Sequence, residues 1–89
     1  MSERGETLLE FPCRFPIKAM GKAGEGFDSL VARLVRRHAP DLGEDAVTLR
    51  ESRGGKWVSV TFVIEATSQQ QIDAIYRDLS ACEKVVWAL

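Results

Sequence analysis

The stretch most suggestive of chemistry is the glycine-rich segment KAMGKAGEGF at residues 18–27, which holds Gly21, Gly24 and Gly26 beside two lysines. Glycine-rich loops that precede helices cradle phosphates, but only at defined spacings. The order here is G-x-x-G-x-G, which matches neither the dinucleotide-binding G-x-G-x-x-G nor the P-loop. We therefore interpret the segment as a strand-to-helix bend. A small anion at the free N–H groups of the helix start is the remaining chemical possibility.

Residues that could act as nucleophiles or metal ligands are few and scattered. Cys13, Cys82 and His38 are the only cysteines and the only histidine. A zinc site needs clustered ligands, such as a C-x-x-C pair, and none occurs here. His38 falls on the apolar stripe of a predicted helix, and no paired carboxylates mark a cleft. We predict no catalytic residue, no metal and no cofactor, and we do not expect an enzyme.

Length and composition limit the classes of protein to which this chain could belong. The 89 residues suffice for one domain, which we place at 13–89 after a flexible N-terminal arm at 1–12. The formal charge is −1, whereas nucleic-acid-binding domains are usually basic. No apolar run approaches the ~20 residues of a membrane span, and the charged start MSERGETLLE lacks the core of an export signal. We expect a cytoplasmic protein with two free thiols.

The elements that position these residues follow from hydrophobic periodicity. Alternating or continuous apolar residues predict four strands, at 13–20, 46–52, 57–66 and 83–89. Apolar spacings of three and four predict a helix over 27–38. A second helix follows Ser68, which has Gln71 at capping-box spacing.

The predicted element order, β-α-β-β-α-β, defines an α+β ferredoxin-like two-layer sandwich. This fold has a four-stranded antiparallel sheet, with strand order 4-1-3-2, and two helices on one face. The strands at 13–20 and 57–66 are therefore expected to be central.

The sheet face opposite the helices lacks a cover from the core elements. By strand alternation this face carries Lys18, Met20, Arg50 and Trp57, which we predict to be a partner surface. The apolar arm residues at 8–11 could fold across part of it. A solvated face without a partner is the alternative.

The last strand is expected on an edge of the sheet, and its stretch 84–89 has Lys84 as its one charged guard. Val85, Trp87 and Leu89 are expected to face the helices. Its unpaired backbone would still permit self-association, so a protein partner or a second copy is the expected partner.

RNA-binding domains of this topology carry stacking aromatic residues on their central strands. The segment RGGKWVSV at 53–60 supplies Trp57, but Gly55 and Val60 stand at the other aromatic positions. Lys18 stands where the first strand would supply another ring. With one ring the stacking platform is incomplete. The sequence therefore argues against nucleic acid, and a weak RNA-binding domain is kept as an alternative.

Three segments carry a resemblance to a known family: LLEFPCRFPIKAMG at 8–21, RRHAP at 36–40 and SVTFVIEAT at 59–67. They resemble the YbeD-like family of small uncharacterised bacterial proteins, whose genes often lie near lipoate-attachment genes. The resemblance implies a ferredoxin-like sandwich similar to ACT regulatory domains, which bind amino acids at the loop after the first strand. By that analogy Gly21, Gly24 and Gly26 would shape a site for a small carboxylate. The family offers no catalytic residue to carry over.

These patterns together predict a non-enzymatic regulatory or protein-interaction module. An ACT-like sensor of a small ligand of the amino-acid type is one alternative, and a weak RNA-binding domain is the other.

Overall fold

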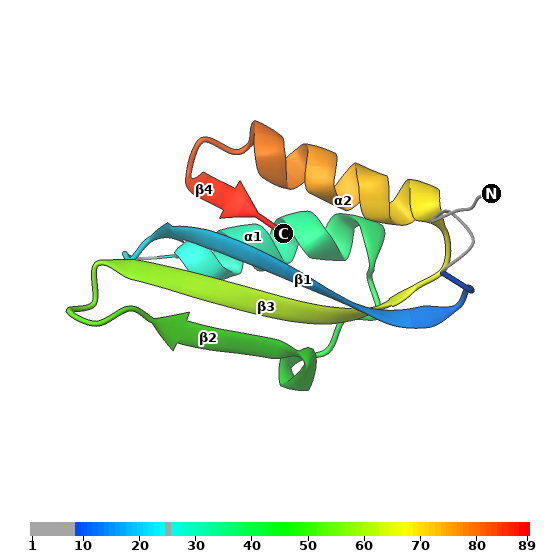
Figure 1. Cartoon of the computed structure of the whole chain (residues 1–89), viewed down its shortest axis with the longest axis horizontal. Helices are drawn as coiled ribbons and strands as arrows, with labels where there is room; N and C mark the ends of the chain where they lie inside the picture. Colours follow the sequence, from blue (N-terminus) through cyan, green and yellow to red (C-terminus); the bar gives the residue numbers. More distant parts are fainter. Residues whose placement is uncertain (1–8, 25) are drawn as a thin grey trace.

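The sheet is built around its two longest strands. In the computed structural model, which describes residues 9–24 and 26–89, β1 (Cys13–Lys22) pairs antiparallel with β3 (Trp57–Ala66) over ten residues. The shorter strands β2 (Val47–Glu51) and β4 (Val85–Ala88) form the two edges, in the order β2-β3-β1-β4 (Figure 1). This confirms the predicted ferredoxin-like fold and strand order.

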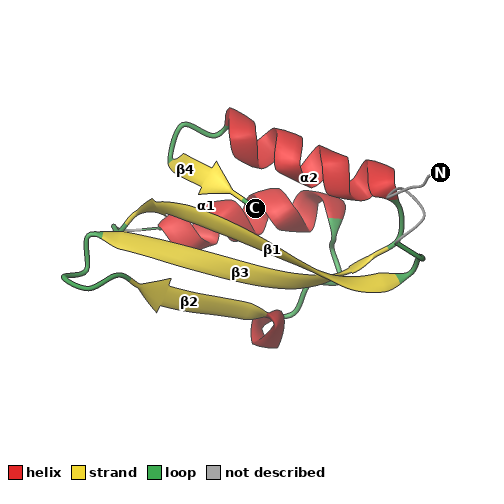
Figure 2. Ribbon diagram, viewed as in Figure 1, coloured by secondary structure: helices red, strands yellow, loops and turns green. Residues whose placement is uncertain are grey.

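Two helices complete the sandwich. The first, α1 (Phe27–His38), connects β1 to the β2–β3 hairpin, and the second, α2 (Gln69–Ala81), connects β3 to β4 (Figure 2). A single turn of 3-10 helix, η2 (Glu44–Ala46), precedes β2. Each helix joins a central strand to another strand of the same sheet, as in the split β-α-β arrangement.

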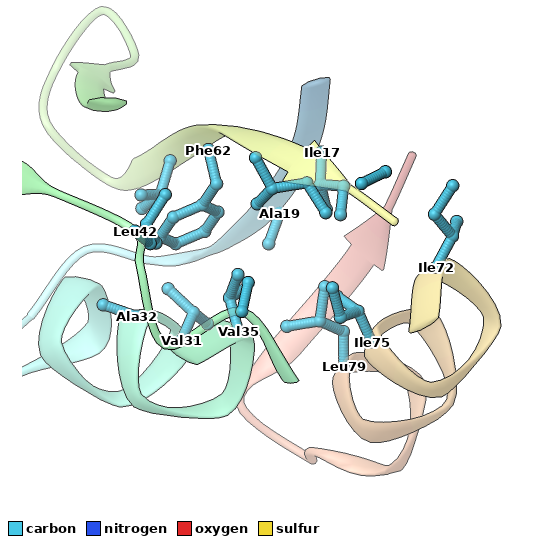
Figure 3. Close-up of a cluster of buried hydrophobic side chains, with 14 of the residues drawn as sticks. Ile17, Ala19, Val31, Ala32, Val35, Leu42, Phe62, Ile72, Ile75 and Leu79 are labelled. Carbon is cyan, nitrogen blue, oxygen red and sulfur yellow. The ribbon is translucent and has the colours of Figure 1, made fainter. Parts of the chain in front are cut away.

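The core lies between the sheet and the helices. Strand alternation directs Ile17 and Ala19 of β1 and Phe62 of β3 toward the helices, where all three are fully buried (Figure 3). The predicted helix stripes meet them. The fully or almost fully buried helix residues are Val31, Val35, Ile72, Ile75 and Leu79. Leu9 and Phe11 are half-buried and pack against this same cluster, while Leu8 lies outside the described residues.

Polar contacts join the C-terminal end of α1 to α2. The Ser68 hydroxyl accepts a hydrogen bond from the Gln71 backbone N–H at 3.1 Å, which confirms the predicted helix cap. The Gln71 side-chain Oε1 accepts from the Thr67 N–H at 2.7 Å, and its Nε2 donates to the His38 carbonyl at 2.7 Å. His38 Nε2 also lies 2.7 Å from the Asp78 carboxylate. His38 therefore ties the two helices together instead of filling the core.

The start of the glycine-rich turn was predicted two residues too early. Gly21 and Lys22 still pair with Val58 and Trp57, so β1 continues to Lys22 instead of ending at Met20. Gly21 is buried, and a Cβ at this position would lie 2.6 Å from the Lys84 carbonyl oxygen and against the Phe27 ring. Glycine is needed here because Phe27 packs directly on the strand backbone.

We predict that Gly21→Ala destabilises the fold by about 1–3 kcal/mol, because the added methyl group overpacks the contact with Phe27. Gly24→Ala is the matched control, since a Cβ there meets no atom within 4 Å. Urea unfolding followed by circular dichroism measures both. Equal midpoints for the two variants would contradict this account of the Phe27 contact.

Candidate binding surface on the sheet

The side of the sheet that faces away from the helices is defined by its register. Directly opposed residues of neighbouring strands share a face. Because Ile17 and Ala19 point into the core, Lys18 and Met20 point to the other side. We call this side the open face. Its residues are Arg14, Pro16, Lys18, Met20, Lys22, Thr48, Arg50, Trp57, Ser59, Thr61, Val63, Glu65 and Trp87.

One row of side chains crosses all four strands of the open face. Met20 of β1 is opposed by Trp87 of β4 on one side and by Ser59 of β3 on the other, and Ser59 is opposed by Arg50 of β2. Ser59 is only 9% exposed although no helix covers it. The longer side chains on either side therefore close over Ser59, and they form a continuous surface across the sheet.

The structure brings together the four residues of the predicted partner surface. Lys18, Met20 and Arg50 lie in two adjacent rows, and Trp57 lies one row further along, opposite Lys22. Trp57 is 40% exposed. All four belong to the open face, as strand alternation predicted.

Trp87 is the residue that sequence reasoning missed. It was expected to face the helices, but it opposes Met20, while Ala88 opposes the fully buried Ala19. The pairing of β1 with β4 shifts register between Met20 and Gly21, so Val85 and Ala88 both contact the core. The run VVWA has no polar residues, so its sequence does not show which side chains point to which face. The irregular pairing turns Trp87 to the open face without leaving any mark in the sequence. Leu89 was also expected to face the helices, but it exchanges backbone hydrogen bonds with Lys18 of the open face and is 70% exposed. Nothing in the sequence alone marked the shift that turns these two residues outward.

Charge is unevenly distributed between the two layers. The open face carries the basic residues Arg14, Lys18, Lys22 and Arg50, and its acidic residue is Glu65, opposite Arg14. In the part of the chain that the structure describes, the ion pairs lie on the helices, where Arg37 is 3.5 Å from the Asp78 carboxylate. A chain with a net charge of −1 therefore presents a basic sheet face.

A hollow of about 470 Å³ opens at the end of the sheet where β1 turns into α1. Gly24 and Gly26 line it, as does Trp57, so the hollow adjoins the open face. Lys22, Lys84 and Glu83 are its charged lining residues, and its apolar wall is made of Phe27, Leu30 and Val86. Gly21, the third glycine of the predicted ligand loop, is buried in β1 and does not line the hollow.

The reactive side chains do not assemble into a site. Cys13 and Cys82 are free and half-buried, and Cys13 begins β1 whereas Cys82 precedes β4, whose first residue opposes Gly21 near the other end of β1. Among residues 9–24 and 26–89, no group of three or more histidines, cysteines or carboxylates could hold a metal ion. Burial raises the pKa of Tyr76, so this phenol on α2 stays neutral.

A second hollow, of about 630 Å³, lies at the opposite end of the molecule and is lined by residues that include Arg14, His38 and Gln71. His38 and Gln71 are already engaged with Asp78 and with the His38 carbonyl, respectively, in the helix-to-helix contacts. These hydrogen bonds hold the two helices together, so His38 and Gln71 are less available to a ligand than the polar side chains of the open face.

These features define a ferredoxin-like α+β protein with a basic sheet face on the side away from its helices. The chain belongs to the bacterial family described as "Protein of unknown function (DUF493)", whose model matches residues 6–89. This confirms the resemblance to YbeD-like proteins. None of the described helices is long and apolar enough to cross a membrane.

Relatives extend over almost the whole chain. A UPF0250 protein of Chromobacterium violaceum is 49% identical over 80 residues, which cover 90% of each chain. A UPF0250 protein of Hahella chejuensis is 38% identical over 88 residues, covering 99% of this chain and 97% of the relative. The solution structure of protein HP0495 from H. pylori superposes with a TM-score of 0.68 at 16% identity, covering 100% of this chain and 98% of that one. At that identity the likeness supports the fold alone.

Proposed function

We propose that this protein is a non-enzymatic binding module of the regulatory class, and that the open face is its contact surface. The observation that carries the proposal is the row of Trp87, Met20, Ser59 and Arg50, which spans all four strands on the side that the helices leave uncovered. Tryptophan, methionine and arginine are enriched at the centres of binding interfaces.

The backbone beneath this row is suited to recognition. Each of its side chains projects from a hydrogen-bonded strand, and surfaces built on regular elements hold their side chains more precisely than loops do. On the described open face there is neither a histidine nor a cysteine to act as nucleophile or general base. Its chemistry is that of charge, hydroxyl groups and aromatic rings, which favours binding over catalysis.

The sheet edges support self-association as an additional mode of contact. Leu49 of β2 is 51% exposed, and Val86 of β4 is 59% exposed. Apolar edge strands with unpaired backbone groups can add a strand from another chain. A second copy pairing at an edge would extend the sheet, and it would leave the open face free.

The second candidate function is a small-molecule sensor at the 470 Å³ hollow. Lys22 and Lys84 beside an apolar wall are complementary to the carboxylate and apolar side chain of an amino acid, and Glu83 in the same lining is complementary to its amino group. This is the ligand type that the resemblance to ACT domains implies, and Gly24 and Gly26 of the predicted loop border the hollow.

If the open face is the contact surface, reversing its charge should abolish partner capture. The combined substitution Lys18→Glu and Arg50→Glu should lower the amount of material captured from a bacterial lysate by about tenfold or more, the size of an interface hot spot. Arg33→Glu with Arg77→Glu makes the same charge change on exposed helix positions, and it should leave capture unchanged. Equal losses in the two variants would remove the open face as the contact surface.

If the hollow is a sensor site, amino acids or short aliphatic carboxylates at millimolar concentration should raise the melting temperature. Ligand at ten times its Kd stabilises a protein by about 1.4 kcal/mol, several degrees for a domain of this size. Lys84→Met should remove the shift, whereas Lys56→Met, outside the hollow, should keep it. The sensor hypothesis fails if no carboxylate shifts the wild-type protein.

A further inference from the structure

We propose that the open face binds single-stranded nucleic acid, with Trp57 and Trp87 as base-stacking platforms and Lys18, Lys22 and Arg50 as phosphate contacts. The inference rests on the proposed function, since it names the occupant of the same surface. It reverses the expectation from the sequence, and the position of Trp87 is the reason.

The sequence lacked a second stacking ring, and the structure supplies one. The register shift in β4 places Trp87 on the open face beside Met20, and Trp57 stands on β3 in the next row. Two strand spacings across and two residues along put the Cα atoms of the two tryptophans roughly 12 Å apart. Aromatic side chains at separate points of one open sheet are how domains of this topology hold successive unpaired bases.

A cation lies between the two rings. Met20 shares the row of Trp87, and Lys22 shares the row of Trp57, so Lys22 stands on the central strand between the two platforms. A strand whose bases stacked on both rings would pass its intervening phosphates over this ammonium group. Lys18 and Arg50 continue the positive charge across β1 and β2, which provides the electrostatic track that such strands follow.

The net charge of the chain does not oppose this proposal, because the described carboxylates lie mainly off the open face, on which Glu65 is the acidic residue. The described acidic residues lie mainly on the helices, on η2 and in the loops, with Asp28 on α1, Glu44 on η2 and Asp73 on α2 as examples. The hairpin between β2 and β3 adds exposed Arg53 and Lys56 next to Trp57. The potential that matters is the local one at the binding surface.

The distribution of charge favours a nucleic acid over a protein. The centre of a protein–protein interface is depleted of charged residues, but here Lys18 and Arg50 stand in the two rows before that of Trp57, and Lys22 stands directly opposite Trp57. Of the remaining positions in these rows, Thr48, Ser59 and Thr61 supply hydroxyls, and Met20 is apolar. Flat rings, cations and hydroxyl groups match the bases, phosphates and sugars of an unpaired strand. A duplex would bury its bases away from the rings.

The test is fluorescence anisotropy of the full chain with labelled oligo(rU), oligo(dT) and a mixed-sequence duplex, each of about 12 nucleotides, within the site sizes known for single-strand binders. We expect both single strands to bind and the duplex to bind at least tenfold more weakly. The ratio of the affinities for oligo(rU) and oligo(dT) then tells whether the open face prefers RNA or DNA. Poly-glutamate, a polyanion without bases, is the control for binding by charge alone.

Two kinds of variant separate the roles. Trp57→Leu should weaken binding roughly 5- to 100-fold through lost stacking, with an unchanged salt slope. Lys18→Gln with Arg50→Gln should also weaken binding, and should reduce the slope of log K against log salt by about 1.4, or 0.7 per phosphate contact. Arg33→Gln with Arg77→Gln on the helices is the charge-matched control, and should change neither. Trp57 is exposed, so the test does not depend on a Trp87 variant that fails to fold.

The proposal is overturned if no single strand binds at low salt, if the helix control loses as much affinity as the face variant, or if poly-glutamate binds as tightly as the oligonucleotides. If those results occur while the Lys18 and Arg50 charge reversal still abolishes capture of proteins from a lysate, the nucleic-acid inference fails and the open face remains a contact surface. If neither assay depends on the face, the proposed function fails as well.

Discussion

The ten-residue antiparallel pairing of β1 with β3 is the constraint on which the rest of the structure depends. Because side chains alternate strictly along each strand, one register decides for both strands which residues enter the core and which point outward. Ile17 and Phe62 oppose each other and are fully buried, and their neighbours Lys18 and Thr61 are opposed on the other side. A slip of one residue would exchange the core for the candidate binding surface, so both are fixed by the same backbone pairing.

The helix layer is adapted to that pairing through close contact at one end and polar ties at the other. Phe27 packs onto the backbone of β1 at Gly21, where a Cβ would overlap the Phe27 ring. At the far end, Gln71 and Asp78 of α2 hold His38 of α1. Neither set of contacts involves the open face. Among the described residues, these contacts therefore hold the helix layer in place, and the side chains of the open face take no part in them.

Hydrophobic periodicity was sufficient to predict the fold and four residues of the open face. The alternation in WVSVTFVIEA and in CRFPIKAM gave the faces of β3 and β1 correctly, so Lys18, Met20, Arg50 and Trp57 were found from the sequence. Two features were not. Gly21 was assigned to the turn because glycine usually breaks a strand, but its role depends on a ring that arrives from another element. The facing of Trp87 depends on an irregular pairing in an entirely apolar strand, where the residues on both sides look alike. Both errors arise from tertiary contacts that leave no local pattern.

Because β4 is much shorter than β1, the first half of β1 has no described strand beside it on the β4 side. Among the described residues, β4 pairs with β1 only from Ala19 to Gly21, and Leu89 exchanges backbone hydrogen bonds with Lys18. The Lys18 N–H points toward β4, so the main-chain nitrogen two residues earlier, that of Pro16, points to the same side beyond the end of β4. A proline nitrogen has no hydrogen to donate. An added strand would therefore meet Pro16 where it needs the first backbone N–H donor beyond β4. Pro16 thus disfavours the addition of a strand along the first half of β1, beside which no described strand lies.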